Sequence, residues 1–176
     1  GAAYVRGLHG DDPKYLKTAA CAKHFAVHSG PEKLRHVFNA KVSPRDLNAT
    51  YLPAFQKLVT EAGVESVMGA YNRTNDEPCC GSPFLLVKTL RGDWAFQGHV
   101  VSDCGAVTDF DEGHKITADV VESAALALKA GCDMSCICAY AHLGEAIDRG
   151  LITEADIDRS LGRTLTTRFK LGMFDP

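Results

Sequence analysis

The chain has 176 residues, enough to bury the core of one ordinary domain. Its composition of 45% hydrophobic and 23% charged residues is typical of a soluble globular protein, and no apolar run approaches the roughly 20 residues that a membrane span requires. The net charge of −3, with no concentrated basic run, gives no electrostatic reason to expect binding to nucleic acid.

The chain opens in helix-like sequence, "GAAYVRGLHG", without an initiator methionine. This opening also lacks the charged and then apolar layout of a signal peptide. We therefore expect the chain to begin inside a longer protein.

Four short apolar runs predict buried strands, at residues 18–25, 64–71, 98–103 and 132–136. A helix is predicted over 43–63, with Ser43 as its N-cap, Pro44 in its first turn and Gly63 at its end. Pro53 is expected to kink this helix. The segments 26–42 and 72–82 are polar and are interpreted as loops.

Further helices follow the later strands. Ser82-Pro83 repeats the helix start of Ser43-Pro44, and a helix is expected over 82–94. The segment 117–131 is helical by its apolar spacing and ends at Gly131. Two helices, over 139–150 and 153–174, close the chain, and Thr153 with Asp156 resembles a capping box at the start of the second.

The repeated order of strand, loop and helix predicts an α/β fold of about four βα units with parallel strands and covering helices. In such folds chemistry gathers at the carboxyl ends of the strands. The polar residues at these ends are Lys23-His24, Tyr71-Asn72-Arg73, Ser102-Asp103 and Asp133-Met134. Each alone has an ordinary structural interpretation, such as a turn aspartate or a strand aromatic. Their shared placement predicts one polar site.

The sequence has no phosphate-binding glycine loop, no G-x-S-x-G elbow and no H-E-x-x-H motif. A carboxylate among Lys, His, Tyr and Arg side chains suits a polyhydroxylated ligand, because these groups donate hydrogen bonds to hydroxyls. An ionised aspartate in that setting can attack an anomeric carbon. Retaining glycoside hydrolysis needs two carboxyl groups about 5–5.5 Å apart, one as nucleophile and one as acid/base.

The seven cysteines lack the paired knuckles of a zinc site, and the nearest approach is Cys132-x₃-Cys136-x-Cys138. We expect them to pack as small buried hydrophobes and do not expect a disulfide framework. A cysteine-based metal module is the alternative from another class, which a zinc assay tests. Cysteines without evident pairing favour a reducing compartment; a periplasmic or secreted parent is the alternative.

Several stretches closely resemble glycoside hydrolase family 3, in the right order along essentially the whole chain. They are "ACAKHFAVHSGPE", "RHVFNAKVSPRDLNATYLPAFQKLV", "ESVMGAYNRTNDEPCCGSPFLL", "WAFQGHVVSDCGAV" and "ALKAGCDM". The resemblance implies that residues 1–176 are a part of the family's N-terminal catalytic domain, a (β/α)₈ barrel of the TIM type, and match its second half. The other half of the barrel and a C-terminal α/β sandwich domain are expected outside this stretch.

By this resemblance Asp103 is the catalytic nucleophile. The −1 sugar subsite would be formed by Lys23, His24, Met68, Tyr71 and Cys104. Cys104 stands where many β-glucosidases of the family have tryptophan, and the "SDC" form resembles the β-xylosidase branch. Arg35 and His36 lie in a loop whose contact with substrate is left open.

His28 falls at the spacing of the second histidine in the "KHFPGHG" signature of the family's β-N-acetylglucosaminidases. Here Ala26-Val27 replaces Pro-Gly and no Asp-Ser-His stretch follows, so that activity is not expected. The acid/base Glu of this branch usually comes from a later domain, and another subsite Asp and an Arg come from the first half of the barrel. Inside this chain, Asp109 and Glu112 are the candidate acids.

The sequence thus predicts part of a retaining glycoside hydrolase acting on β-linked xylosides of hemicellulose, inactive as an isolated stretch. The alternatives are a β-glucosidase of the same family and a non-catalytic half-barrel. No metal or organic cofactor is expected. The expected partner is a glycoside or oligosaccharide, with neither nucleic acid nor membrane. Exposed sheet edges also predict a complementary barrel fragment or a homo-oligomer.

Overall fold

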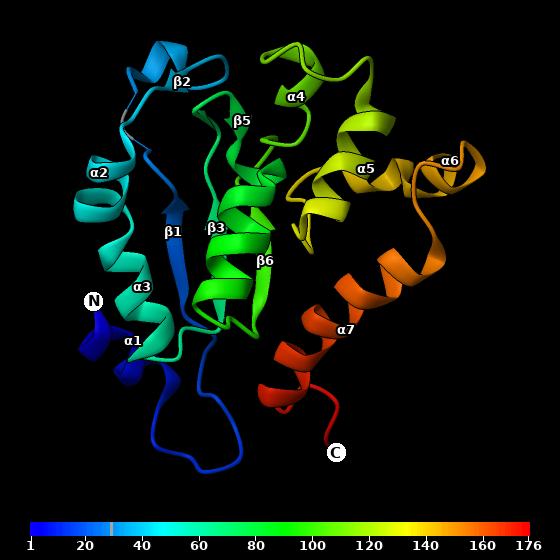
Figure 1. Cartoon of the computed structure of the whole chain (residues 1–176). Coiled ribbons are helices and arrows are strands. Elements are labelled where there is room, and N and C mark those ends of the chain that lie inside the picture. Colours follow the sequence, from blue (N-terminus) through cyan, green and yellow to red (C-terminus); the bar gives the residue numbers. More distant parts are fainter. Residues whose placement is uncertain (29) are drawn as a thin grey trace.

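The central feature of the chain is a parallel sheet of three strands in the order β1–β3–β6, seen in a computed structural model that describes residues 1–28 and 30–176 (Figure 1). The strands are β1 (Cys21–Phe25), β3 (Ser66–Gly69) and β6 (His99–Ser102). The fourth apolar run adds a single parallel bridge between Met134 and Val101. The predicted α/β fold with parallel strands is confirmed.

The register of the sheet separates its two faces. Val67 of β3 pairs with Ala22 of β1 and with Val100 of β6, and all three side chains are buried. Because side chains alternate along a strand, Met68 and its partner Val101 lie on the other face, where both are only partly buried. On that second face Lys23 is exposed and His99 is partly buried, whereas Ser66 is buried.

Helices cover the buried face. The predicted helix over 43–63 is broken into α2 (Pro44–Asp46), a π-helical turn η2 (Leu47–Tyr51) and α3 (Pro53–Thr60). Ser43 caps it as expected, since its Oγ accepts a hydrogen bond from the Asp46 backbone N–H at 3.1 Å. Pro53 begins α3 and has no N–H to continue the ladder, which accounts for the interruption.

The other helix boundaries follow their predicted signals. Ser82 caps the π-helical segment η4 (Pro83–Asp93), and Gly131 ends α5 (Val120–Ala130) in the left-handed conformation with φ of 94°. The capping box of Thr153 and Asp156 opens α7 (Glu154–Lys170). The remaining helical elements are α1 (Ala2–His9), η1 (Glu32–Leu34), η3 (Cys79–Gly81), α4 (Asp109–Glu112), η5 (Ala139–His142) and α6 (Leu143–Asp148).

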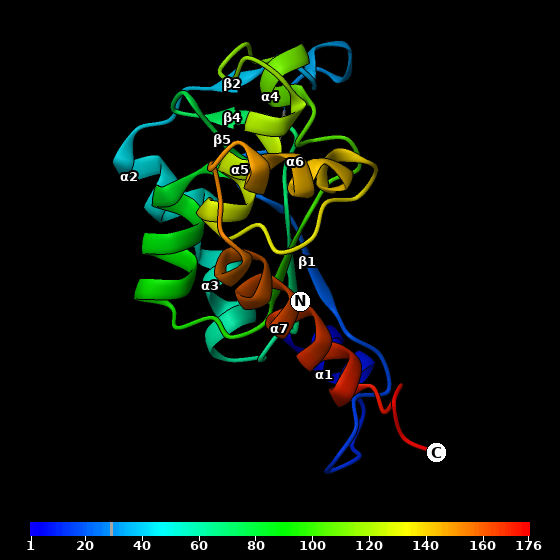
Figure 2. The same ribbon diagram turned by 90° about the vertical axis from the view of Figure 1, so that its right-hand side faces the viewer.

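A second, small sheet forms where the sequence predicts only loops. Strand β2 (Asn39–Ala40) pairs in parallel with β4 (Arg73–Thr74), which pairs antiparallel with β5 (Glu77–Pro78). The turn between β4 and β5 is Asn75-Asp76, both with positive φ, a conformation that these two residue types tolerate. Figure 2 shows this sheet with α4 beyond the carboxyl ends of the main strands.

The core lies between the sheet and its helices. Phe25 at the end of β1 is fully buried, and its ring meets Phe55 of α3 at 5.0 Å and Trp94 at 5.9 Å between centroids. This aromatic cluster fixes the end of β1, close to the predicted site residues. In the part of the chain described, no helix combines the length and apolar character needed to cross a membrane.

Candidate active site

Asp103 directly follows β6 and is held by backbone hydrogen bonds. Its own N–H donates to the Gly69 carbonyl of β3 at 3.0 Å, which continues the sheet by one residue. The N–H of Cys104 donates to Asp103 Oδ1 at 2.8 Å. The side chain is 17% exposed, so the carboxylate is fixed in place and still accessible. These properties suit a nucleophile at the tip of a strand.

His24 of β1 faces this carboxylate. Its Nε2 lies 3.4 Å from Asp103 Oδ2, and the ring of His28 lies 4.6 Å from the His24 ring. Burial lowers the pKa of His24, and the negative charge of Asp103 opposes that shift. A neutral imidazole is therefore favoured, with a ring N–H available to a hydroxyl.

Tyr71 follows β3 and reaches the same place. Its hydroxyl donates a hydrogen bond to the Cys104 carbonyl. The His36 ring meets the Tyr71 ring edge-on at 5.0 Å, and the Arg35 guanidinium lies over it at 5.0 Å. Burial, followed by the charge of Asp103, raises the pKa of Tyr71. The phenol is thus kept protonated as a donor.

The remaining predicted site residues, Lys23 and Met68, lie on neighbouring strands. Lys23 precedes His24 in β1 and is exposed, while Met68 is partly buried in β3 opposite Val101 of β6. Both belong to the accessible face of the sheet by strand alternation. The structure thus brings His24, Tyr71 and Cys104 against Asp103, with Lys23 and Met68 on the strands beside it.

The expectation that the cysteines pack only as small buried hydrophobes is wrong for Cys104 and Cys136, which form a disulfide. The place of Cys104 in the sugar subsite stays a prediction. The bond joins the residue after Asp103 to the segment that follows the Met134 bridge. Backbone contacts run alongside it, from Gly105 N–H to the Cys136 carbonyl at 3.0 Å and from Cys136 N–H to Ser102 Oγ at 3.0 Å. Local spacing did not reveal the pair, since 32 positions separate the two cysteines.

The other five cysteines are free thiols. Cys79, Cys80 and Cys132 are buried, as expected of small hydrophobes, whereas Cys21 and Cys138 are exposed and do not pack as predicted. Across residues 1–28 and 30–176, no group of three or more His, Cys, Asp or Glu side chains is arranged to hold a metal ion.

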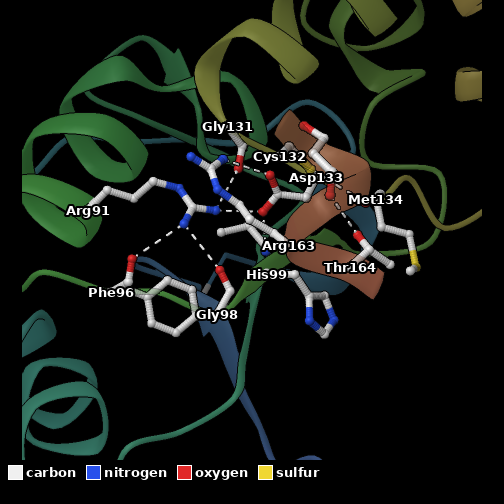
Figure 3. A network of polar contacts seen from close by, with 12 residues as sticks. Arg91, Phe96, Gly98, His99, Gly131, Cys132, Asp133, Met134, Arg163 and Thr164 are labelled. Atoms are coloured by element: carbon white, nitrogen blue, oxygen red, sulfur yellow. Dashed lines mark hydrogen bonds and ion pairs between the residues drawn. The ribbon is translucent and has the colours of Figure 1, made fainter. Parts of the chain in front are cut away.

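Asp133 was predicted at the polar site and lies elsewhere, in a buried ion-pair network (Figure 3). Its Oδ2 is 2.5 Å from Arg91 Nη2 and its Oδ1 is 2.9 Å from Arg163 Nη1, and the Asp133 side chain is 0% exposed. Oδ2 also accepts the N–H of Val100 at 2.8 Å. Asp133 therefore ties η4 and α7 to strand β6 and does not face the site.

Asp109 and Glu112, the candidate acids, differ in their surroundings. The Asp109 carboxylate is buried and contacts His36 Nδ1 at 2.9 and 3.1 Å, whereas Glu112 is exposed at the end of α4. The pairing of His36 with Asp109 was not predicted. These residues stand 73 positions apart, and only the fold brings their loops together.

Comparisons with known proteins agree with this architecture. Residues 1–167 match the model of the glycosyl hydrolase family 3 N terminal domain. The chain is 50% identical to a xylan 1,4-beta-xylosidase of Xylanibacter ruminicola over 99% of the chain and 21% of that protein. It is 42% identical to beta-D-xylosidase 1 of Arabidopsis thaliana over 99% of the chain and 23% of that protein.

Solved structures match equally well. A GH3 exo-beta-xylosidase, XlnD, in complex with a xylobiose aziridine probe has a TM-score of 0.94 and 31% identity, over 99% of this chain and 24% of that one. A beta-glucosidase from Listeria innocua in complex with glucose has a TM-score of 0.89 and 33% identity, over 99% and 25%.

The chain belongs to glycosyl hydrolase family 3 and matches the family's N-terminal domain. Its parallel strands and covering helices follow the barrel-like fold of its solved relatives, as the sequence predicts. It spans about a fifth to a quarter of the length of the relatives that it matches.

Proposed function

We propose that the protein containing this chain is a retaining glycoside hydrolase that acts on β-linked xylosides, with Asp103 as its nucleophile. The observation that carries the proposal is the setting of Asp103. Its Oδ1 is held by the Cys104 N–H at 2.8 Å, and its Oδ2 faces His24 at 3.4 Å on the accessible side of the strand ends.

In the first step, an Asp103 carboxylate oxygen attacks the anomeric carbon and forms a glycosyl-enzyme ester while the bond to the leaving oxygen breaks. The leaving oxygen takes a proton from an acid group. In the second step, water deprotonated by the conjugate base of that acid attacks the same carbon and restores the carboxylate.

The sugar itself is proposed to be bound by the side chains around Asp103. Lys23 and His24 would donate hydrogen bonds to its hydroxyls, and Met68 and Tyr71 would form a wall of the subsite. The acid/base is proposed to come from the parent protein outside residues 1–176. The Asp109 carboxylate is already paired with His36, and Glu112 is an exposed helix-end residue, so neither is suited to that role.

The xyloside preference is supported by the 50% identity to a xylan 1,4-beta-xylosidase and by the place of Cys104. Its disulfide partner Cys136 would bring a second segment of backbone to the edge of the proposed sugar subsite. The second candidate, a β-glucosidase, is favoured by the likeness to the beta-glucosidase of Listeria innocua. Both candidates use Asp103 as the nucleophile. They differ in the sugar that the space beside Asp103 would have to admit.

A trapping experiment tests the nucleophile. The full-length parent is incubated with a 2-fluoro xyloside that carries a good leaving group and is then digested and analysed by mass spectrometry. We expect the sugar on the peptide that contains Asp103. A label on any other peptide would show that the assignment is wrong. Rates with aryl xyloside, arabinofuranoside and glucoside then decide the sugar, and a faster glucoside would favour the second candidate.

A further inference from the structure

The loop after β1 and the segment after β6 meet at the contact between His36 and Asp109. His36 Nδ1 lies 2.9 Å from Asp109 Oδ2 and 3.1 Å from Oδ1, so both carboxylate oxygens share one ring nitrogen. The backbones also approach closely, since a Cβ on Gly113 would lie 2.0 Å from the His36 carbonyl oxygen. The position of His36 is thus set by its side chain and by its backbone.

Asp109 is anchored more firmly than its partner. Its side chain is 8% exposed, against 56% for His36. Burial raises the pKa of Asp109, and the contact with His36 opposes that shift. A buried carboxylate is costly without a partner, and His36 supplies the ring nitrogen that lies against it. The pair is therefore a fixed connection between the two loops.

On its other side the His36 ring meets Tyr71. The two rings are edge to face at 5.0 Å, and Arg35 lies over the Tyr71 ring at the same distance. The Tyr71 hydroxyl donates to the Cys104 carbonyl, and the Cys104 N–H donates to Asp103 Oδ1. An unbroken series of contacts therefore leads from the buried Asp109 to the Asp103 carboxylate.

We propose that His36, held by Asp109, is a positioning residue: it sets the Tyr71 ring, whose hydroxyl holds the Cys104 peptide and with it the Asp103 carboxylate. His36 acts through Tyr71 and needs no contact with the sugar. The catalytic consequence rests on the proposed function. This consequence is expected because the rate of nucleophilic attack by Asp103 depends steeply on geometry: a misplacement of about 1 Å costs on the order of 100-fold in rate.

The first test measures inactivation of the full-length parent by the 2-fluoro xyloside. His36→Ala is expected to lower the first-order inactivation rate by about 10- to 100-fold and to change the inhibitor concentration for half-maximal rate less than threefold. His36→Gln, which still has a donor for Asp109, should recover part of the rate. Lys41→Gln is the matched control, because it breaks the exposed ion pair with Asp76 and should leave the rate unchanged.

A double-mutant cycle separates positioning through Tyr71 from a general structural effect. If His36 acts through Tyr71, then adding His36→Ala to Tyr71→Phe lowers the inactivation rate much less than His36→Ala does alone. Equal losses in the two backgrounds would overturn the proposal. A change only in the inhibitor concentration that gives the half-maximal rate would also overturn the proposal, since that pattern indicates a substrate-binding residue.

The second test needs no activity. The phenol of Tyr71 is titrated by its ultraviolet absorbance, and its contribution is isolated by subtracting the Tyr71→Phe titration. Burial and the Asp103 charge hold the pKa of Tyr71 above its usual value, so a loosened ring in His36→Ala should titrate at lower pH. An unchanged titration would overturn the proposal. Failure of the wild-type parent to be labelled at Asp103 counts against the proposed function, and this titration still decides whether His36 holds Tyr71.

Discussion

The Nε2 atom of His24 lies 3.4 Å from Oδ2 of Asp103, although the two residues come from strands at opposite edges of the three-stranded sheet. Strand β3 separates β1 from β6 and ends in the small residue Gly69. A Cβ on Gly69 would lie 2.5 Å from Cys80 Sγ, so no larger side chain fits at that point. The carboxylate and the imidazole meet beyond the end of the middle strand.

Replacement of Asp103 by Asn tests this relationship and the proposed chemistry together. Activity of the full-length parent should fall by about three orders of magnitude or more, since an amide cannot form the glycosyl-enzyme. The pKa of His24 should fall further below its usual value, because in the wild-type protein the negative charge of Asp103 raises it. Histidine-labelled nuclear magnetic resonance measures that shift, and a rise in the His24 pKa would contradict the arrangement.

Loss of the Cys104–Cys136 disulfide should weaken both stability and the site. The bond spans 32 residues, and removing such a link costs up to roughly 3 to 4 kcal/mol in the chain-entropy account. We expect Cys136→Ser to lower the urea midpoint and the rate of xyloside hydrolysis. Cys138→Ser, which changes an exposed free thiol nearby, is the control. Peptide mapping without reductant should recover Cys104 and Cys136 in one linked species.

The buried network around Asp133 should be sensitive to the loss of its charge. In Asp133→Asn the guanidinium groups of Arg91 and Arg163 lose their shared carboxylate, and breaking a buried pair costs about 3–5 kcal/mol. Urea unfolding measures the loss. Glu61→Gln, which breaks the exposed pair with Lys57, should change the midpoint little. Equal midpoints for the two variants would refute a stabilising role for the network.

His114 should give the folded protein a pH-dependent penalty in acid. Burial, with repulsion from Arg73 and His36, lowers the pKa of His114 to about 4 from an ordinary value of 6.5. The unfolded chain therefore binds the proton first as the pH falls through 6.5, and stability is lost progressively between pH 6.5 and 4. Across that window the loss is roughly 3 kcal/mol.

A variant isolates this contribution. The His114 ring is stacked on Phe110 with planes 19° apart, so His114→Phe keeps an aromatic ring in place without a titrating group. The wild-type minus variant difference in unfolding free energy, measured at pH 7 and pH 5, should shift against the wild type at the lower pH. A difference that does not change with pH would show that His114 is not held neutral by the fold.

The sequence determined the order of the three main strands and the ends of several helices, because these depend on local chemistry. Ser43, Ser82, Thr153 and Gly131 each cap a helix where predicted, and the first three apolar runs supply the parallel strands. The motifs around Asp103 and His24 were also sufficient to predict the family. Each of these signals is carried by residues within a few positions of one another.

Only the tertiary structure decided which distant residues meet. The pairings Cys104–Cys136 and His36–Asp109 and the burial of Asp133 between two arginines all join different βα units. Their sequence separations leave no periodic or short-range pattern. The first two follow from the parallel register, which brings the strand ends and the loops beyond them to one edge of the sheet. The Asp133 network instead follows from the packing of η4 and α7 against β6. The sequence thus predicts Asp103 as a site residue, while the side chains that hold it in position are selected by the packing of the loops around it.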